Sequence, residues 1–231
     1  MVSGGPGRVA ALSYLLSEAG VTPDQQAAVH SARALHAAGF AISPGVAVQA
    51  AARGGHLHVL AWLVEALLGG DAGRLDGWAF AAAAKSGSVE LMAWMRERGC
   101  PWDAHAFGIA AGAGCEEALE WLVAQGCPME ERGQPYVAAI MNKDLATLRC
   151  LRRLGCPWGP PGPVFACAAR YASLPTLRWL LEAGCPLDDA AAADAARARG
   201  GDVGPALLEL LAVRGVRQAA AKAAARSSGR G

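Results

Sequence analysis

A Gly-Cys-Pro tripeptide recurs four times in this chain, at residues 99–101, 126–128, 155–157 and 184–186. Its four cysteines are 27, 29 and 29 residues apart. A period of this length is typical of repeat proteins, in which each repeat buries its apolar face only by stacking on its neighbours. The spacing therefore predicts a solenoid in which each repeat ends at a Gly-Cys-Pro turn.

The residues before each cysteine predict a helix. Apolar residues stand eight and five positions before it, as in Met92 and Met95 or Leu177 and Leu180, which is the spacing of one helical face. The start of this helix is marked by N-cap residues at Ser88, Asp144 and Ser173. Its end is marked by the glycine of the tripeptide, after which the proline prevents continuation.

A second register predicts a shorter helix that precedes this one in each repeat. Phe80, Phe107, Tyr136 and Phe165 recur at the same spacing, and each is followed by a run of mostly small residues. Ile and Thr occur only three times each, whereas Ala, the strongest helix former, is the commonest residue. We therefore expect an all-α solenoid of about six helix pairs with short turns between repeats.

Three segments follow from the extent of this pattern. Residues 43–216 form the repeat array, and residues 1–42 are expected to be a degenerate N-terminal repeat or cap. Residues 217–231 are a basic tail rich in Ala, Gly and Ser, which we expect to be disordered. Five basic residues and no acidic residue follow Glu209, so a contact of the tail with an anionic surface stays open.

The bulk properties restrict the possible partners and the compartment. A net charge of +1 argues against a dedicated nucleic-acid binder. No apolar run is long enough for a membrane span, and the first twenty residues lack the pattern of a signal peptide. Seven cysteines, an odd number, favour free thiols in a reducing compartment. The sequence predicts an intracellular, cytoplasmic monomer, and the nucleus stays open as its location.

The repeat resembles that of ankyrin-repeat proteins. The resemblance lies in Gly55-His56-Leu57-His58-Val59-Leu60-Ala61-Trp62-Leu63-Val64 and its copies, and in Gly99-Cys100-Pro101-Trp102-Asp103, which is similar to a short repeat variant of algae, protists and giant viruses. It covers residues 43–216 and, more weakly, 8–42. The usual Thr-Pro-Leu-His of the first helix is absent, and the repeats are shorter than 33 residues. The resemblance implies a surface that binds another protein.

No motif points to catalysis, a cofactor or a metal. The Gly-rich stretches lack the Gly-Lys-Ser/Thr of a phosphate loop, and no nucleophile elbow is present. The regular cysteines invite a zinc or haem interpretation, but they lack the close clustering of a zinc site. We therefore expect Cys100, Cys127, Cys156 and Cys185 to be small buried residues, and Trp62, Trp94, Trp121 and Trp179 to pack between repeats.

The sequence thus predicts a non-enzymatic protein-interaction module or adaptor. The alternative is a structural subunit or fragment of a larger ankyrin-repeat protein with an effector domain elsewhere, which is suggested by a pattern that begins inside a second helix. The contacts are expected from turn and first-helix positions, and Trp is favoured at binding hot spots. The candidate residues are Trp102, Asp103, His105, Met129, Glu130, Glu131, Trp158, Leu187 and Asp188.

Overall fold

The computed structural model describes residues 29–30, 33–34, 36–37 and 43–228, with side chains as far as residue 216. Every secondary-structure element in this part is a helix, which confirms the predicted all-α class. The chain divides into two compact units, called here unit 1 (up to Glu130) and unit 2 (from Glu131). Gly-Cys-Pro repeats lie on both sides of this boundary, so the sequence pattern does not indicate where the boundary falls. Most of residues 1–42, predicted to be a degenerate repeat, lie outside the described residues.

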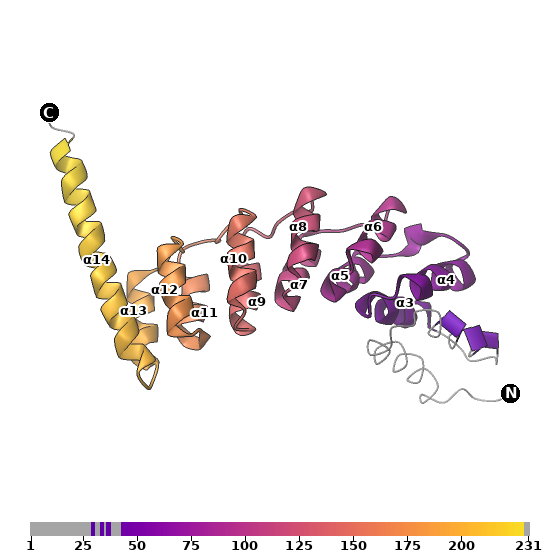
Figure 1. Cartoon of the computed structure of the whole chain (residues 1–231), viewed down its shortest axis with the longest axis horizontal. Coiled ribbons are helices and arrows are strands. Elements are labelled where there is room, and N and C mark those ends of the chain that lie inside the picture. Colours follow the sequence, from indigo (N-terminus) through magenta and orange to yellow (C-terminus); the bar gives the residue numbers. More distant parts are fainter. Residues whose placement is uncertain (1–28, 31–32, 35, 38–42, 229–231) are drawn as a thin grey trace. The chain divides into compact units, whose positions relative to one another are not determined.

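Unit 1 contains three helix pairs in its described part. The first helices α3, α5 and α7 pack on one another, and the second helices α4, α6 and α8 form a second row (Figure 1). The elements are α3 (Pro44–Arg53), α4 (Leu57–Leu68), the 3-10 helix η2 (Ala72–Arg74), α5 (Gly77–Ser86), α6 (Val89–Glu97), α7 (Ala104–Ala113) and α8 (Glu116–Ala124).

Unit 2 repeats this arrangement. The first helices α9, α11 and α13 pack in sequence, and the last helix α14 packs on both α12 and α13. The elements are α9 (Gln134–Met141), α10 (Leu145–Arg153), α11 (Pro163–Tyr171), α12 (Leu174–Glu182), α13 (Asp189–Ala198) and α14 (Val203–Ser228).

The predicted helix boundaries are confirmed by hydrogen bonds at the N-caps. The side chains of Ser88, Asp144 and Ser173 accept hydrogen bonds from backbone N–H groups three residues further on, at 3.3, 3.0 and 3.4 Å. These bonds satisfy donors that have no partner inside the helix. Local chemistry therefore marks where α6, α10 and α12 begin, whereas α4 and α8 begin without a side-chain cap.

The aromatic residues of the first helices form the centre of each unit. Phe80, Phe107, Tyr136 and Phe165 are all 0% exposed. Tyr136 is the polar member of the series, and its hydroxyl donates a 2.9 Å hydrogen bond to the carbonyl oxygen of Cys156. Burial is the main cause that raises the pKa of Tyr136. Each Gly-Cys-Pro turn thus lies close to the core of its unit.

The last helix, α14, extends as far as Ser228, into residues 217–231 that were predicted to be a disordered basic tail. The physical reason is the Ala-rich run at 219–225, because Ala has the highest helix propensity and no β-branched residue interrupts the run. Residues 229–231 lie outside the described part of the chain.

Candidate protein-interaction surface

Each Gly-Cys-Pro turn ends a second helix and buries its cysteine. The four glycines have φ between 75 and 79°, and the four cysteines are at most 5% exposed, which confirms their prediction as small buried residues. Burial raises the pKa of Cys100 and Cys185 to about 12 and that of Cys127 to about 11. These thiols therefore stay protonated near neutral pH, which makes them poor nucleophiles and poor metal ligands.

The described residues contain neither a candidate metal cluster nor a candidate membrane span. No three His, Cys, Asp or Glu side chains there lie close enough together to hold a metal ion. None of the described helices combines the length and the apolar character that crossing a membrane requires.

Thiol labelling tests the burial of the cysteines. Cys115 and Cys167 are partly exposed, whereas the other five cysteines are buried. We expect the Cys115 and Cys167 thiols of the native protein to react quickly with an aromatic disulfide reagent. The other five thiols should react at least about tenfold more slowly, because the reagent does not reach them and burial disfavours the reactive thiolate. Mass spectrometry of the labelled sites checks this order, and all seven thiols should react alike in urea. Fast labelling of Cys100 or Cys185 in the native state would contradict the buried turns.

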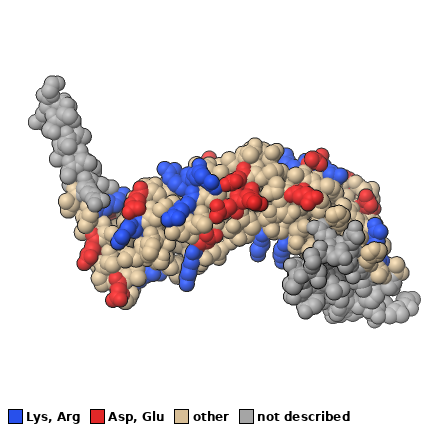
Figure 2. Space-filling view, viewed as in Figure 1, with Lys and Arg blue, Asp and Glu red and all other residues tan. Residues whose placement is uncertain are grey.

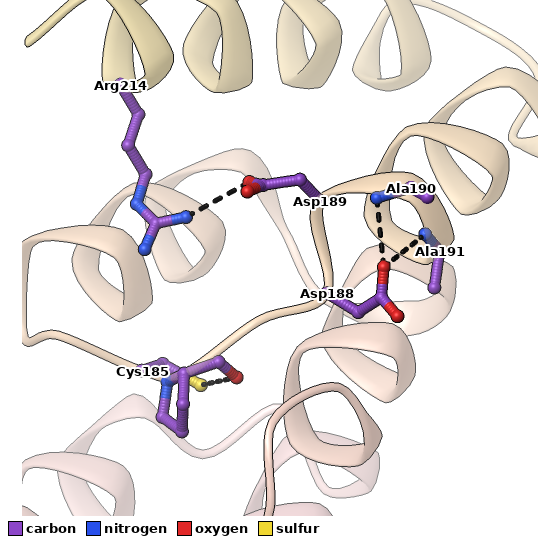
Figure 3. Close-up of polar contacts among 7 residues, drawn as sticks. Cys185, Asp188, Asp189, Ala190, Ala191 and Arg214 are labelled. Atoms are coloured by element: carbon purple, nitrogen blue, oxygen red, sulfur yellow. Dashed lines mark hydrogen bonds and ion pairs between the residues drawn. The ribbon is translucent and has the colours of Figure 1, made fainter. Parts of the chain in front are cut away.

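Two of these turns are followed by an aspartate that caps the next first helix, α7 or α13. Asp103 accepts a 2.9 Å hydrogen bond from the backbone N–H of His105. Asp188 accepts bonds from Ala190 and Ala191 at 3.0 and 3.1 Å, as Figure 3 shows. Asp103 and Asp188 were predicted as partner-binding residues, and both side chains are exposed. The structure therefore assigns each a structural role and leaves its carboxylate accessible.

Trp102 links neighbouring repeats inside unit 1. Its ring makes edge contacts with Phe80 of α5 at 5.4 Å and with Trp121 of α8 at 6.1 Å between ring centroids. The guanidinium of Arg96 lies 4.1 Å from the ring centroid and donates a 2.6 Å hydrogen bond to the carbonyl oxygen of Cys100. The Trp102 side chain is half-buried. Packing is thus its evident role.

Trp158 has the corresponding role in unit 2. It stacks on Tyr136 with 3.9 Å between centroids and lies 6.2 Å from Trp179. Its indole Nε1 is buried and has no hydrogen-bond partner among the described residues. The backbone beside it is tightly packed, since a Cβ on Gly133 would overlap the carbonyl oxygen of Trp158. Trp158 is therefore half-buried and held in one position.

Trp78 is a surface residue that the sequence reasoning missed. It lies at the start of α5 and is 65% exposed, although indole rings are usually largely buried. Its ring packs edge-on against that of His105 at 4.8 Å, and His105 is exposed at the start of α7. Both residues stand two positions before the core aromatic residue of their repeat. An alignment of the repeats would therefore have placed Trp78 and His105 at equivalent positions.

The remaining predicted residues do not form a single cluster. Met129 and Glu130 follow α8 in unit 1 and are half-buried, whereas Glu131 is exposed and belongs to unit 2. Leu187 is half-buried beside Asp188 at the start of α13. Within unit 1, only Trp102, Asp103 and His105 lie together, and Trp78 adds to them.

The comparisons with known proteins agree with this architecture. No protein-family model matches the chain, and no curated protein matches it. The chain is similar to the crystal structure of the human ASB11 ankyrin repeat domain, with a TM-score of 0.60 and 22% sequence identity over 84% of this chain and 96% of that one. The fold is therefore that of an ankyrin-repeat domain, which confirms the predicted helical-repeat solenoid.

Proposed function

We propose that this chain is a non-enzymatic protein-binding module, used as an adaptor, whose contact surface lies at the first-helix starts of unit 1. The observation that carries the proposal is the exposed pair of Trp78 and His105. Tryptophan is the residue most enriched at binding hot spots, because it contributes a large apolar area and one polar N–H group. The ankyrin-repeat fold supports the same class of function.

The neighbourhood of the pair suits a partner with polar or basic groups. The Asp76 and Asp103 side chains cap α5 and α7, and both are exposed. Carboxylates beside an exposed indole favour a cationic side chain, which pairs with the carboxylate and lies over the ring. The net charge of the chain, +1, supports a protein partner over a nucleic acid. We further propose a monomer acting in the cytoplasm and built from the short Gly-Cys-Pro-Trp-Asp repeat variant.

The test begins with affinity purification and mass spectrometry, followed by calorimetry with the purified partner. Trp78→Ala is expected to raise the Kd about 30-fold, the effect of removing a hot spot of roughly 2 kcal/mol. The matched control is Trp94→Ala, since Trp94 lies on α6 and is covered by Arg98 at 4.1 Å from its ring centroid. A partner that binds Trp78→Ala as tightly as wild type, or loses more affinity with Trp94→Ala, would place the surface elsewhere.

A further inference from the structure

Lys143 occupies a turn position that is glycine in the preceding repeats, those of unit 1, and Ala172 in the repeat that follows. The tight turns between the helices of unit 1 use Gly55, Gly87 and Gly114, with φ of 71, 75 and 74°. Lys143 takes the same position in unit 2 with φ of 58°, and it is the single non-glycine residue with positive φ in the described chain. Because a Cβ disfavours this backbone conformation, folding alone does not explain the choice of lysine.

The Lys143 turn borders a cavity of about 250 Å³ in unit 2. Five of its lining residues carry hydrogen-bond donors, namely Lys143, Tyr171, Ser173, Thr176 and Arg199, and the others are apolar. The donors come from the α9–α10 turn, from the end of α11 and the start of α12, and from the residue after α13. Segments far apart in sequence therefore bring two cations and three hydroxyl groups to one cavity.

The residues that line the cavity include two cations and no carboxylate. Neither Lys143 nor Arg199 forms an ion pair within the described residues. The adjacent Asp144 carboxylate is held by Thr147, from its backbone N–H at 3.0 Å and its hydroxyl at 2.7 Å. Lys143 is exposed and free to direct its three N–H donors to a bound group.

Arg199 and the hydroxyl groups are positioned in advance. One guanidinium nitrogen of Arg199 donates to the carbonyl oxygens of Ala169, at 2.8 Å, and Ala168, at 3.5 Å, which anchors the side chain at the end of α11. The Ser173 and Thr176 hydroxyl groups share a 3.0 Å hydrogen bond, which fixes both and leaves one O–H donor of the pair for a ligand. A ligand thus meets a fixed cation and fixed hydroxyl groups, which lowers the entropy cost of binding.

We propose that this cavity binds a phosphate group. A phosphate monoester carries nearly two negative charges and three strong acceptor oxygens, which match two cations and several donors. A carboxylate offers one charge and two oxygens, so it fits the same set of donors less completely. The phosphate could belong to a phosphorylated side chain of a bound protein or to a small molecule, since both present the same chemical group.

The test is a titration followed by amide NMR at constant ionic strength, with inorganic phosphate as the first probe. We expect saturable shifts at Lys143, Ser173 and Thr176, and an increase in Kd of at least about tenfold in Lys143→Asn. Asparagine tolerates a left-handed backbone, so this variant should melt no lower than wild type. The matched control is Arg149→Asn, which removes an exposed cation of α10 that does not line the cavity. Basic side chains gather over α10 (Figure 2). The Kd of Arg149→Asn should stay within about twofold of wild type.

Two further probes identify the source of the phosphate. A phosphoserine peptide that binds more tightly than inorganic phosphate, while its serine counterpart does not bind, supports a phosphorylated protein. Equal binding of inorganic phosphate and phosphopeptide supports a small molecule. The proposal is overturned if no phosphate probe gives saturable shifts, if acetate binds as tightly as phosphate, or if Arg149→Asn weakens binding as much as Lys143→Asn.

Discussion

The Gly133→Ala variant is expected to lose about 2–5 kcal/mol of the free energy of unfolding. Gly133 has φ of 79° at the start of α9. An added Cβ would overlap the carbonyl oxygen of Trp158 and lie 2.7 Å from Val164 Cγ2, so both backbone strain and steric overlap oppose the substitution. Urea denaturation followed by circular dichroism measures the loss.

The control for this prediction is Gly155→Ala. Gly155 has a similar φ of 75°, but its added Cβ would meet no atom within 4 Å. This variant should lose only the cost of a left-handed alanine, about 1–2 kcal/mol. Equal losses in the two variants would show that the 133 and 158 turns do not pack as described. A further check is Gly159→Ala, whose Cβ would overlap the backbone of Arg132 at the same junction.

The second large effect is expected for Phe107→Ala, which should destabilise unit 1 by about 3–5 kcal/mol. Phe107 is 0% exposed and is flanked on α7 by buried alanines, which cannot expand to fill the space. Urea denaturation monitored by tryptophan fluorescence measures the change.

The matched surface variant is Trp78→Ala, which removes a larger aromatic ring from the neighbouring first helix. Because Trp78 is 65% exposed, its loss should change stability by no more than about 0.5 kcal/mol. If Trp78→Ala destabilised the protein as much as Phe107→Ala, Trp78 would be a core residue and its assignment to the contact surface would fail.

The architecture was predictable because its determinants are local and periodic. A proline after each cysteine, a glycine before it and an N-cap residue such as Ser88 specify the helix ends without reference to distant residues. The recurrence of Phe80, Phe107, Tyr136 and Phe165 likewise located the first helix of each repeat. These local signals can be recognised in one sequence alone.

The surface was less predictable, because exposure depends on contacts between repeats. Trp102 and Trp158 stand after a turn, and both are half-buried against rings from other segments of the chain. Trp78 is a large aromatic residue like those of the core, but it lies on the opposite side of α5 from Phe80. The partner-binding roles of the candidate residues remain predictions.

Hydrogen exchange of the complex with its purified partner tests the central claim most directly. Binding is expected to slow amide exchange in the first turns of α5 and α7, around Trp78 and His105, and to leave exchange in α6 and α8 unchanged. Slower exchange confined to α6 and α8, with no change at the starts of α5 and α7, would contradict it.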